Sequence, residues 1–290
     1  RFPRFPAFEY GRARPEKMTG AMEANLIDAH IHTRFSHDGI SDMEEYMLAA
    51  RERGVCEMTF TEHWDDYTGM KSDHSAVDIP AYYAEYLRMK EKYGAPRINF
   101  GIEMGLQPHI AEKVHAVVSS YPFDFVIGSS HITAGKDMAM DSGFFAGLTR
   151  HEAYMVYFRE VLENIRVHED FDVYGHLDYV ARYGGYAEKE VRYAEFADIL
   201  DEILGALISR GKGLELNTSG LRKGLPSAHP NTEILRRYRE LGGEIITLGS
   251  DAHSARDLAA DFGTAKEMLK SAGFREIAVY HARKPDFVKI

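Results

Sequence analysis

Short runs rich in β-branched residues alternate with stretches of helical period, and this alternation limits the possible folds more than any other feature. We expect strands over Asn25–Ile31, Val55–Thr61, Arg97–Glu103, Asp124–Ser130, Asp172–His176, Gly213–Asn217 and Glu244–Ser250, with Glu276–Tyr280 as an eighth candidate. We expect helices over Asp42–Arg53, Pro80–Tyr93, Pro108–Ser119, Arg150–His168, Glu188–Arg210, Asn231–Leu241 and Ala255–Ala272. No low-complexity linker divides these units. They therefore predict one parallel α/β sheet, either closed into a barrel or open and doubly wound.

Polar side chains follow almost every expected strand. In chain order they are His30, His32 and Asp38, then His63, Glu103, His131, His176 and Asp178, Glu215 and Asn217, and finally Asp251 and His253. Barrel enzymes gather catalytic groups at the carboxyl ends of many strands, so this placement favours a TIM-barrel-like single domain over an open sheet.

The first of these strands lies in LIDAHIHTRFSHDG, which has Asp28, His30 and His32 at every second position. Residues two apart on a strand point to the same side. A buried polar group without a partner costs about 2–7 kcal/mol, so three of them on one side need compensation. A metal ion provides it for two imidazoles and a carboxylate, and Asp28 is placed to orient the ring of His30.

A single histidine or carboxylate beside a strand is more often a core or capping residue than a ligand, but the whole set needs one explanation. A polynuclear metal site provides it, because such a site takes neutral imidazoles and ionised carboxylates together. Imidazole and carboxylate ligands without thiolate suit zinc, iron or manganese. About nine ligands are enough for two or three divalent ions, and Glu103 could bridge two of them about 3.5–4 Å apart.

Metal-assisted hydrolysis is the chemistry that such a cluster favours, since bound metals lower the pKa of water from 15.7 to about 7. The sequence contains neither a G-x-x-x-x-G-K-[ST] loop nor a G-x-S-x-G elbow. Cations that could bind phosphate oxygens are Arg182 in YVARYGG and Arg222 and Lys223 in NTSGLRKG. We also expect His229 in SAHPN to contact the substrate.

Charge and composition narrow the class of partner. With 45 acidic and 35 basic residues the net charge is −10, which argues against nucleic-acid or anionic-membrane binding. The single cysteine, Cys56, cannot form an internal disulfide, so we expect a cytoplasmic protein. No stretch approaches 18 uninterrupted apolar residues. We expect the basic, proline-containing residues 1–24 to form an extension outside the fold and not a signal peptide.

The motifs DAHIHTRFSHDG, TEHWD, GIEMG, GSSH, GHLD and GSDAH, in this order, resemble those of the polymerase-and-histidinol-phosphatase (PHP) family of metal-dependent phosphoesterases. Within the family the chain is most similar to the histidinol-phosphate phosphatase branch, through LDYVARYGG, ELNTSGLRKG, SAHPN and AGFREIAVYHARKP. The resemblance extends from about Asn25 to the C-terminus.

The resemblance implies a distorted (β/α)7 barrel over residues 25–290 that holds three metal ions. The implied ligand sets are His30, His32, Glu103 and Asp251 for the first ion, Glu103, His131 and His176 for the second, and Asp38, His63 and His253 for the third. Arg182 and Arg222 match positions expected to bind the phosphate, and either Asp251, His253 or water would protonate the leaving alcohol. The implied reaction is hydrolysis of L-histidinol phosphate to L-histidinol and phosphate, in histidine biosynthesis.

Three alternatives stay open. The same site could act on another small phosphate ester or on phosphotyrosine. Amidohydrolases also begin with H-x-H on a first barrel strand, but they commonly use a bridging lysine where this chain has Glu103. PHP modules also occur as nuclease parts of DNA polymerases, which the charge of −10 disfavours. The oligomeric state is not readable from the sequence.

Overall fold

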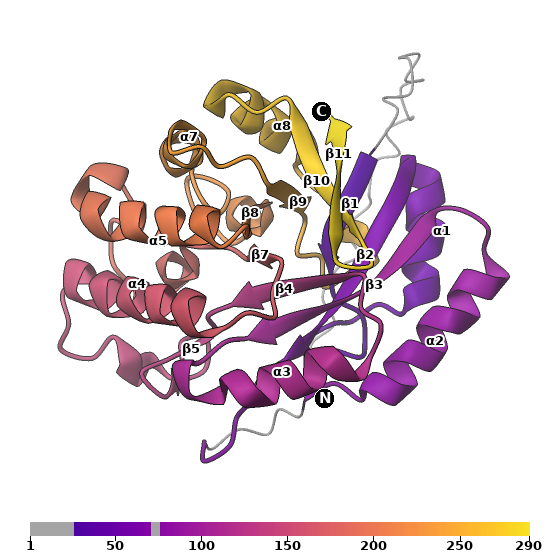
Figure 1. Ribbon diagram of the computed structural model, residues 1–290, viewed down its shortest axis with the longest axis horizontal. Coiled ribbons are helices and arrows are strands. Elements are labelled where there is room, and N and C mark those ends of the chain that lie inside the picture. The colour runs from indigo at the N-terminus through magenta and orange to yellow at the C-terminus, as the bar shows by residue number, and fades with distance from the viewer. Residues whose placement is uncertain (1–25, 71–75) are drawn as a thin grey trace, which may run out of the picture.

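Seven parallel strands form one nearly closed barrel in the computed structural model, which describes residues 26–70 and 76–290 (Figure 1). The strands, in their order around the sheet, are β1 (Leu26–Ile31), β2 (Val55–Trp64), β3 (Arg97–Gly105), β4 (Phe125–Ser129), β7 (Val173–Tyr174), β8 (Gly213–Asn217) and β9 (Ile246–Gly249). A bridge between Ile31 and Ala252 joins the end of the first strand to the segment that follows the last strand. The predicted barrel is therefore confirmed, and the open doubly wound sheet is excluded.

Helices connect the strands and cover the outside of the barrel (Figure 1). They are α1 (Met43–Arg53), α2 (Ile79–Lys92), α3 (Ala111–Ser120), α4 (Arg150–Val167), α5 (Ala197–Ser209), the short α6 (Ser219–Arg222), α7 (Thr232–Glu240) and α8 (Phe262–Ala272). Local sequence explains several boundaries. Asp42 and Thr149 form capping boxes at the starts of α1 and α4. Gly54 ends α1 with a φ of 74°, which glycine adopts at little cost.

Two predicted helices begin later than expected. Residues 188–196 do not continue α5, because in residues 188–192 only Val191 is buried and an amphipathic face is missing. Residues 255–257 form a separate 3₁₀ turn, and α8 starts at Phe262. The eighth strand is β10 (Glu276–His281), which pairs antiparallel with β11 (Lys284–Lys289) and lies outside the main sheet. A small hairpin of β5 (Ile132–Thr133) and β6 (Lys136–Asp137) was not expected.

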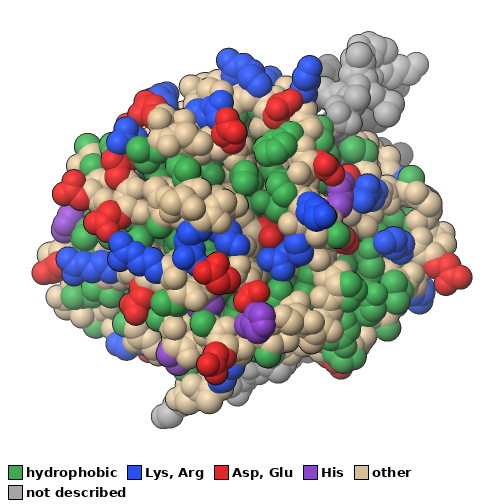
Figure 2. Space-filling model, in the orientation of Figure 1, with side chains coloured by type: hydrophobic (Ala, Val, Ile, Leu, Met, Phe, Trp, Pro, Cys, Tyr) green, Lys and Arg blue, Asp and Glu red, His purple; other side chains and the backbone are tan. Residues whose placement is uncertain are grey.

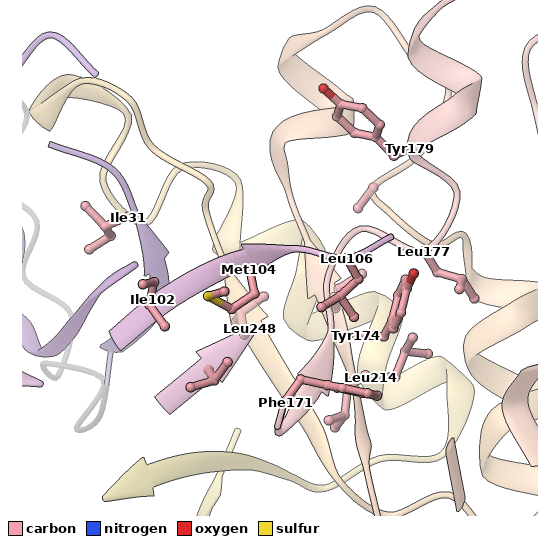
Figure 3. Close-up of a cluster of buried hydrophobic side chains, with 14 of the residues drawn as sticks. Ile31, Ile102, Met104, Leu106, Phe171, Tyr174, Leu177, Tyr179, Leu214 and Leu248 are labelled. Atoms are coloured by element: carbon pink, nitrogen blue, oxygen red, sulfur yellow. The ribbon is translucent and has the colours of Figure 1, made fainter. Parts of the chain in front are cut away.

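Apolar side chains fill the space between the strands and the helices. Figure 3 labels Ile102 and Met104 of β3 and Leu248 of β9 among the buried side chains of this core. A smaller cluster contains residues of β1, β4 and β7 together with Ala278 and Tyr280 of β10. The β10–β11 turn is held by Asp124, whose carboxylate accepts from the backbone of residue 282, at the amino-terminal end of the strands. The opposite, carboxyl-terminal end is thereby left for polar groups.

The surface carries acidic and basic side chains intermixed over the face in Figure 2, as is typical of a solvated surface. Within residues 26–70 and 76–290, the helices are too short or too polar to cross a membrane. The predicted extension over residues 1–24 lies outside the described part of the chain, as do Asn25 at the start of the first predicted strand and His74.

Candidate metal centre

Histidines and carboxylates from six strands meet at the carboxyl-terminal end of the barrel. The nine predicted ligands are His30 in β1, His32 and Asp38 after it, His63 in β2, Glu103 in β3, His131 after β4, His176 after β7, and Asp251 and His253 after β9. Six of them line a pocket of about 320 Å³, while His30, His32 and Glu103 lie beneath it and are fully buried. The structure therefore brings all nine to one place.

Glu103 lies at the centre of this cluster. Its Oε2 atom is 3.3 Å from Nε2 of His30, 3.3 Å from Nε2 of His32 and 2.9 Å from Nδ1 of His63. Its Oε1 atom is 2.8 Å from Nε2 of His176 and 3.2 Å from Nε2 of His131. Oε2 is buried and makes no hydrogen bond to any described residue, which is costly unless a cation neutralises it.

In their neutral forms, His30 and His32 would each carry a hydrogen on Nδ1 and a lone pair on Nε2, as their hydrogen-bond partners indicate. Nδ1 of His30 lies 2.6 Å from Oε1 of Glu215, so it carries the hydrogen and Nε2 carries a lone pair. Nδ1 of His32 lies 3.2 Å from Oγ of Ser36, whose own hydrogen goes to Glu62 at 2.6 Å. Nε2 of His32 therefore also presents a lone pair, only 2.9 Å from Nε2 of His30. Two converging lone pairs beside a carboxylate oxygen fit a shared metal ion.

The protonation states of His32 and Glu103 agree with this fit. Burial acts to lower the pKa of His30, but the carboxylates of Glu215 and Glu103 raise it well above its usual value, and a bound metal ion would replace the proton that they attract. Burial lowers the pKa of His32, and the nearby imidazole of His63 lowers it further, so the ring stays neutral. Burial acts to raise the pKa of Glu103, but the imidazoles around it, His30 foremost, hold it well below its usual value. Neutral imidazole and ionised carboxylate are the forms that bind metals.

The remaining carboxylates, Asp251 and Asp38, lie beside histidines of the implied first and third ligand sets. Oδ1 of Asp251 is 3.9 Å from Nε2 of His30 and 3.5 Å from Nε2 of His32. Asp38 lies 3.6 Å from Nε2 of His63 through Oδ1 and 3.0 Å from Nε2 of His253 through Oδ2. Potential ligand atoms also lie within 4.8 Å of one another in the groups His30/His32/Glu103, His63/Glu103/His131 and His32/His63/His253. The first group lies within the implied first set, and each of the other two joins two residues of one implied set with a histidine of another. The assignment of ligands to individual ions stays a prediction.

Backbone strain is concentrated at the same end of the barrel. His176 and Asp251 have φ values of 23° and 54°, in the left-handed region that favours glycine. Such conformations cost about 1–3 kcal/mol each and persist where the surroundings enforce them. Here the backbone N–H of His176 donates to Glu215 at 2.8 Å, and that of Asp251 donates to the carbonyl of His30 at 2.8 Å.

Comparisons with known proteins agree with this site. The sequence profile of the PHP domain matches residues 28–219. The chain belongs to the PHP family. The histidinol-phosphatase of Lactococcus lactis subsp. lactis is 35% identical over 90% of this PHP chain and 96% of its own length. A probable histidinol-phosphatase of Clostridium acetobutylicum is 31% identical over 87% and 96% of the two chains.

Solved structures share the PHP fold. A crystal structure of the Lactococcus lactis histidinol phosphate phosphatase, complexed with zinc, L-histidinol and phosphate, has a TM-score of 0.81 to this chain. The two are 34% identical, and the match covers 90% of this chain and 98% of that one. The putative histidinol phosphatase of Listeria monocytogenes has a TM-score of 0.72 at 21% identity, over 82% and 99% of the two chains, which supports the fold alone.

Two residues that orient histidines of the PHP centre were not identified as site residues from the sequence. Glu215 contacts His30 in the place expected for Asp28, and Asp65 lies 3.0 Å from Nδ1 of His131. The expectation for Asp28 is wrong, because its carboxylate accepts from Ser250 and from the backbone of Ala259. The signal for Glu215 was its place at a strand end. The signal for Asp65 was its place just after His63 in TEHWDD.

The predicted substrate-binding cations separate into two groups. Arg182 and Lys223 line the pocket. Arg222 does not, since its guanidinium donates to the carbonyl of Ser250 and to Thr218. A phosphate contact by Arg222 stays a prediction. The expected contact of His229 with substrate is corrected, because its ring is fully buried.

Proposed function

We propose that this chain hydrolyses L-histidinol phosphate to L-histidinol and phosphate, as a step of histidine biosynthesis in the cytoplasm. The observation that carries the proposal is that the Nε2 atoms of His30 and His32 face each other beside Glu103, 2.9 Å apart at the base of a polar pocket. Support for this substrate comes from the Lactococcus lactis phosphatase, whose crystal structure contains zinc, L-histidinol and phosphate.

The nine ligands would hold two or three divalent ions in the sets given above, and zinc, iron and manganese all suit them. Ions bound there activate water near neutral pH and neutralise charge on a phosphoryl group. Glu103 belongs to two of the sets and would hold their shared position. Asp251 and His253, at the pocket wall, would complete the first and third sets.

Arg182 would orient the phosphate. Its side chain is 9% exposed, and its Nη2 amine donates to Oδ2 of Asp251 at 3.0 Å. Its Nη1 amine makes no hydrogen bond within the described residues, so it can donate to a phosphoryl oxygen from the pocket wall. Lys223 lines the same pocket and would add positive charge there.

Phosphate release from L-histidinol phosphate by the metal-loaded protein tests this proposal. We expect its kcat/KM to exceed that of other sugar or amino-alcohol phosphates and of phosphotyrosine peptides. A higher kcat/KM for one of those esters would identify that ester as the preferred substrate. Cleavage of single-stranded DNA without phosphatase activity would favour the nuclease alternative.

Replacing Glu215 with glutamine is expected to weaken metal binding by about 10–100-fold, because carboxylates that orient a ligating histidine contribute on this scale. The amide cannot accept from both Nδ1 of His30 and the backbone of His176 as the carboxylate does. Metal content after dialysis against graded chelator measures the effect. Glu57→Gln is the matched control, because Glu57 contacts His281 at 2.7 Å near the other end of β2. Equal metal content in both variants would contradict the role of Glu215.

The outer wall of the pocket suggests how the alcohol part is recognised. Oδ1 of Asp137 accepts from the backbone of Ala139 at 2.8 Å and of Met140 at 3.1 Å, and the hydroxyl of Tyr67 donates to Oδ2 at 3.2 Å. Asp137 also lines the pocket, so we propose that its carboxylate accepts a hydrogen bond from the ammonium group of histidinol phosphate.

Asp137→Asn is therefore expected to lower kcat/KM for L-histidinol phosphate by about 10–100-fold, since a hydrogen bond to a charged group contributes roughly 1.5–3 kcal/mol. Hydrolysis of p-nitrophenyl phosphate, which lacks a cation, should be almost unchanged. Asp141→Asn is a matched control, because Asp141 lies in the same loop but does not line the pocket. A similar loss for both esters would argue against a contact with the ammonium group.

A further inference from the structure

We propose that His229 is a positioning residue for Arg182. In this proposal its neutral imidazole joins Asp178 to Arg182 and fixes the plane of the guanidinium, so that the Nη1 amine faces the phosphate. The proposal rests on the proposed function, because it assigns Arg182 to the phosphate of the substrate.

The three side chains form a buried chain behind the pocket. Nδ1 of His229 lies 2.6 Å from Oδ1 of Asp178, and Nε of Arg182 donates to Nε2 of His229 at 3.1 Å. His229 is 0% exposed and Asp178 is 5% exposed. The backbone of His229 is also fixed, since it exchanges hydrogen bonds of 2.8 Å and 2.7 Å with Asn217 at the end of β8.

The partners of His229 define its tautomer. The Nε–H group of arginine is always a donor, so Nε2 of His229 must accept and cannot carry a hydrogen. The hydrogen therefore lies on Nδ1, where the carboxylate of Asp178 accepts it. A second hydrogen on Nε2 would point at the Nε–H group of Arg182 and add a like charge beside it. His229 thus acts as a neutral acceptor of defined direction.

Other contacts hold the rest of the guanidinium. Nη2 of Arg182 donates to Asp251 at 3.0 Å and to the hydroxyl of Ser219, and its central carbon lies 4.9 Å from the centre of the Tyr179 ring. These contacts restrain one edge and one face, while His229 restrains the Nε edge. The Nη1 amine can donate to a phosphoryl oxygen only when the plane of the guanidinium is defined, and displacement of a binding group by about 1 Å can cost 10²-fold in rate.

A double-mutant cycle tests the proposal. His229→Leu removes the acceptor and keeps an apolar side chain in the buried position, and Arg182→Lys removes the Nε–H donor. We expect His229→Leu to weaken inhibition by inorganic phosphate by about 10-fold or more in the wild type. In the Arg182→Lys background the same change should alter inhibition less than about 3-fold, because the group that His229 holds is missing.

His168→Leu is the matched control, because His168 is another buried histidine and Nε2 contacts the carbonyl of Gln107 at 2.9 Å, outside the pocket. It should lower the melting temperature and leave phosphate inhibition unchanged. Asp178→Ala is a second variant, which keeps His229 but removes the acceptor that defines its tautomer, and it should weaken inhibition in the same direction. Metal content is measured for every variant.

Equal effects of His229→Leu in both backgrounds, or unchanged inhibition in both the His229 and the Asp178 variants, would overturn the proposal. Direct binding of inorganic phosphate to the metal-loaded wild type, measured by calorimetry, needs no turnover. Wild-type protein that binds phosphate but does not hydrolyse L-histidinol phosphate would contradict the proposed substrate and leave the role of His229 to be decided by the binding cycle.

Discussion

Replacing Glu103 with glutamine is expected to lower kcat/KM for L-histidinol phosphate by more than about 100-fold, since even carboxylates that only orient a ligand contribute 10–100-fold. Glu103 contacts five imidazoles, and it is the one carboxylate that belongs to two of the implied ligand sets. An amide keeps the shape but removes the charge that neutralises the ions. Phosphate release and metal content, measured on the same preparation, test both consequences.

Asp172→Asn is the control for this variant. Asp172 is a buried carboxylate just before β7, at the amino-terminal end of the barrel, where it pairs with Arg283 at 2.6 Å. We expect Asp172→Asn to lower thermal stability but to retain metal content and kcat/KM. If Glu103→Gln retained wild-type activity, the proposed centre would be refuted, whether or not the variant had lost its metal.

Removal of metal by a chelator is expected to abolish phosphate release, because the proposed hydrolysis depends on metal-activated water and the described residues that line the pocket include no serine, threonine or cysteine. Addition of zinc, manganese or iron(II) should restore it. The same additions should raise the melting temperature, since a ligand at 100 times its Kd stabilises the folded state by about 2.7 kcal/mol.

Two further preparations distinguish this effect from inhibition by the chelator itself. Chelator that is already saturated with zinc should not inactivate the protein. Glu103→Gln should show a smaller rise of the melting temperature with zinc than the wild type does. Full activity of protein shown by elemental analysis to contain no metal would exclude the mechanism.

The β-α alternation and the strand-end residues were sufficient to predict the barrel and the meeting of the nine candidate ligands. Both follow from local properties. A period of two or 3.6 residues identifies the elements. Parallel strands also have their carboxyl ends at one end of a barrel, so Glu103 and Asp251 must approach each other although 148 residues separate them.

The residues that form hydrogen bonds to these ligands and to Arg182 could be identified only from the tertiary structure. Glu215, and not Asp28, contacts the ring of His30, because barrel closure brings β8 within reach of the ring while the carboxylate of Asp28 accepts from the backbone after β9. His229 likewise supports Arg182 from behind and does not contact the pocket. Sequence spacing defines which end of a strand a residue occupies. Only the packing of segments up to 231 residues apart decides which of several nearby carboxylates accepts a given N–H.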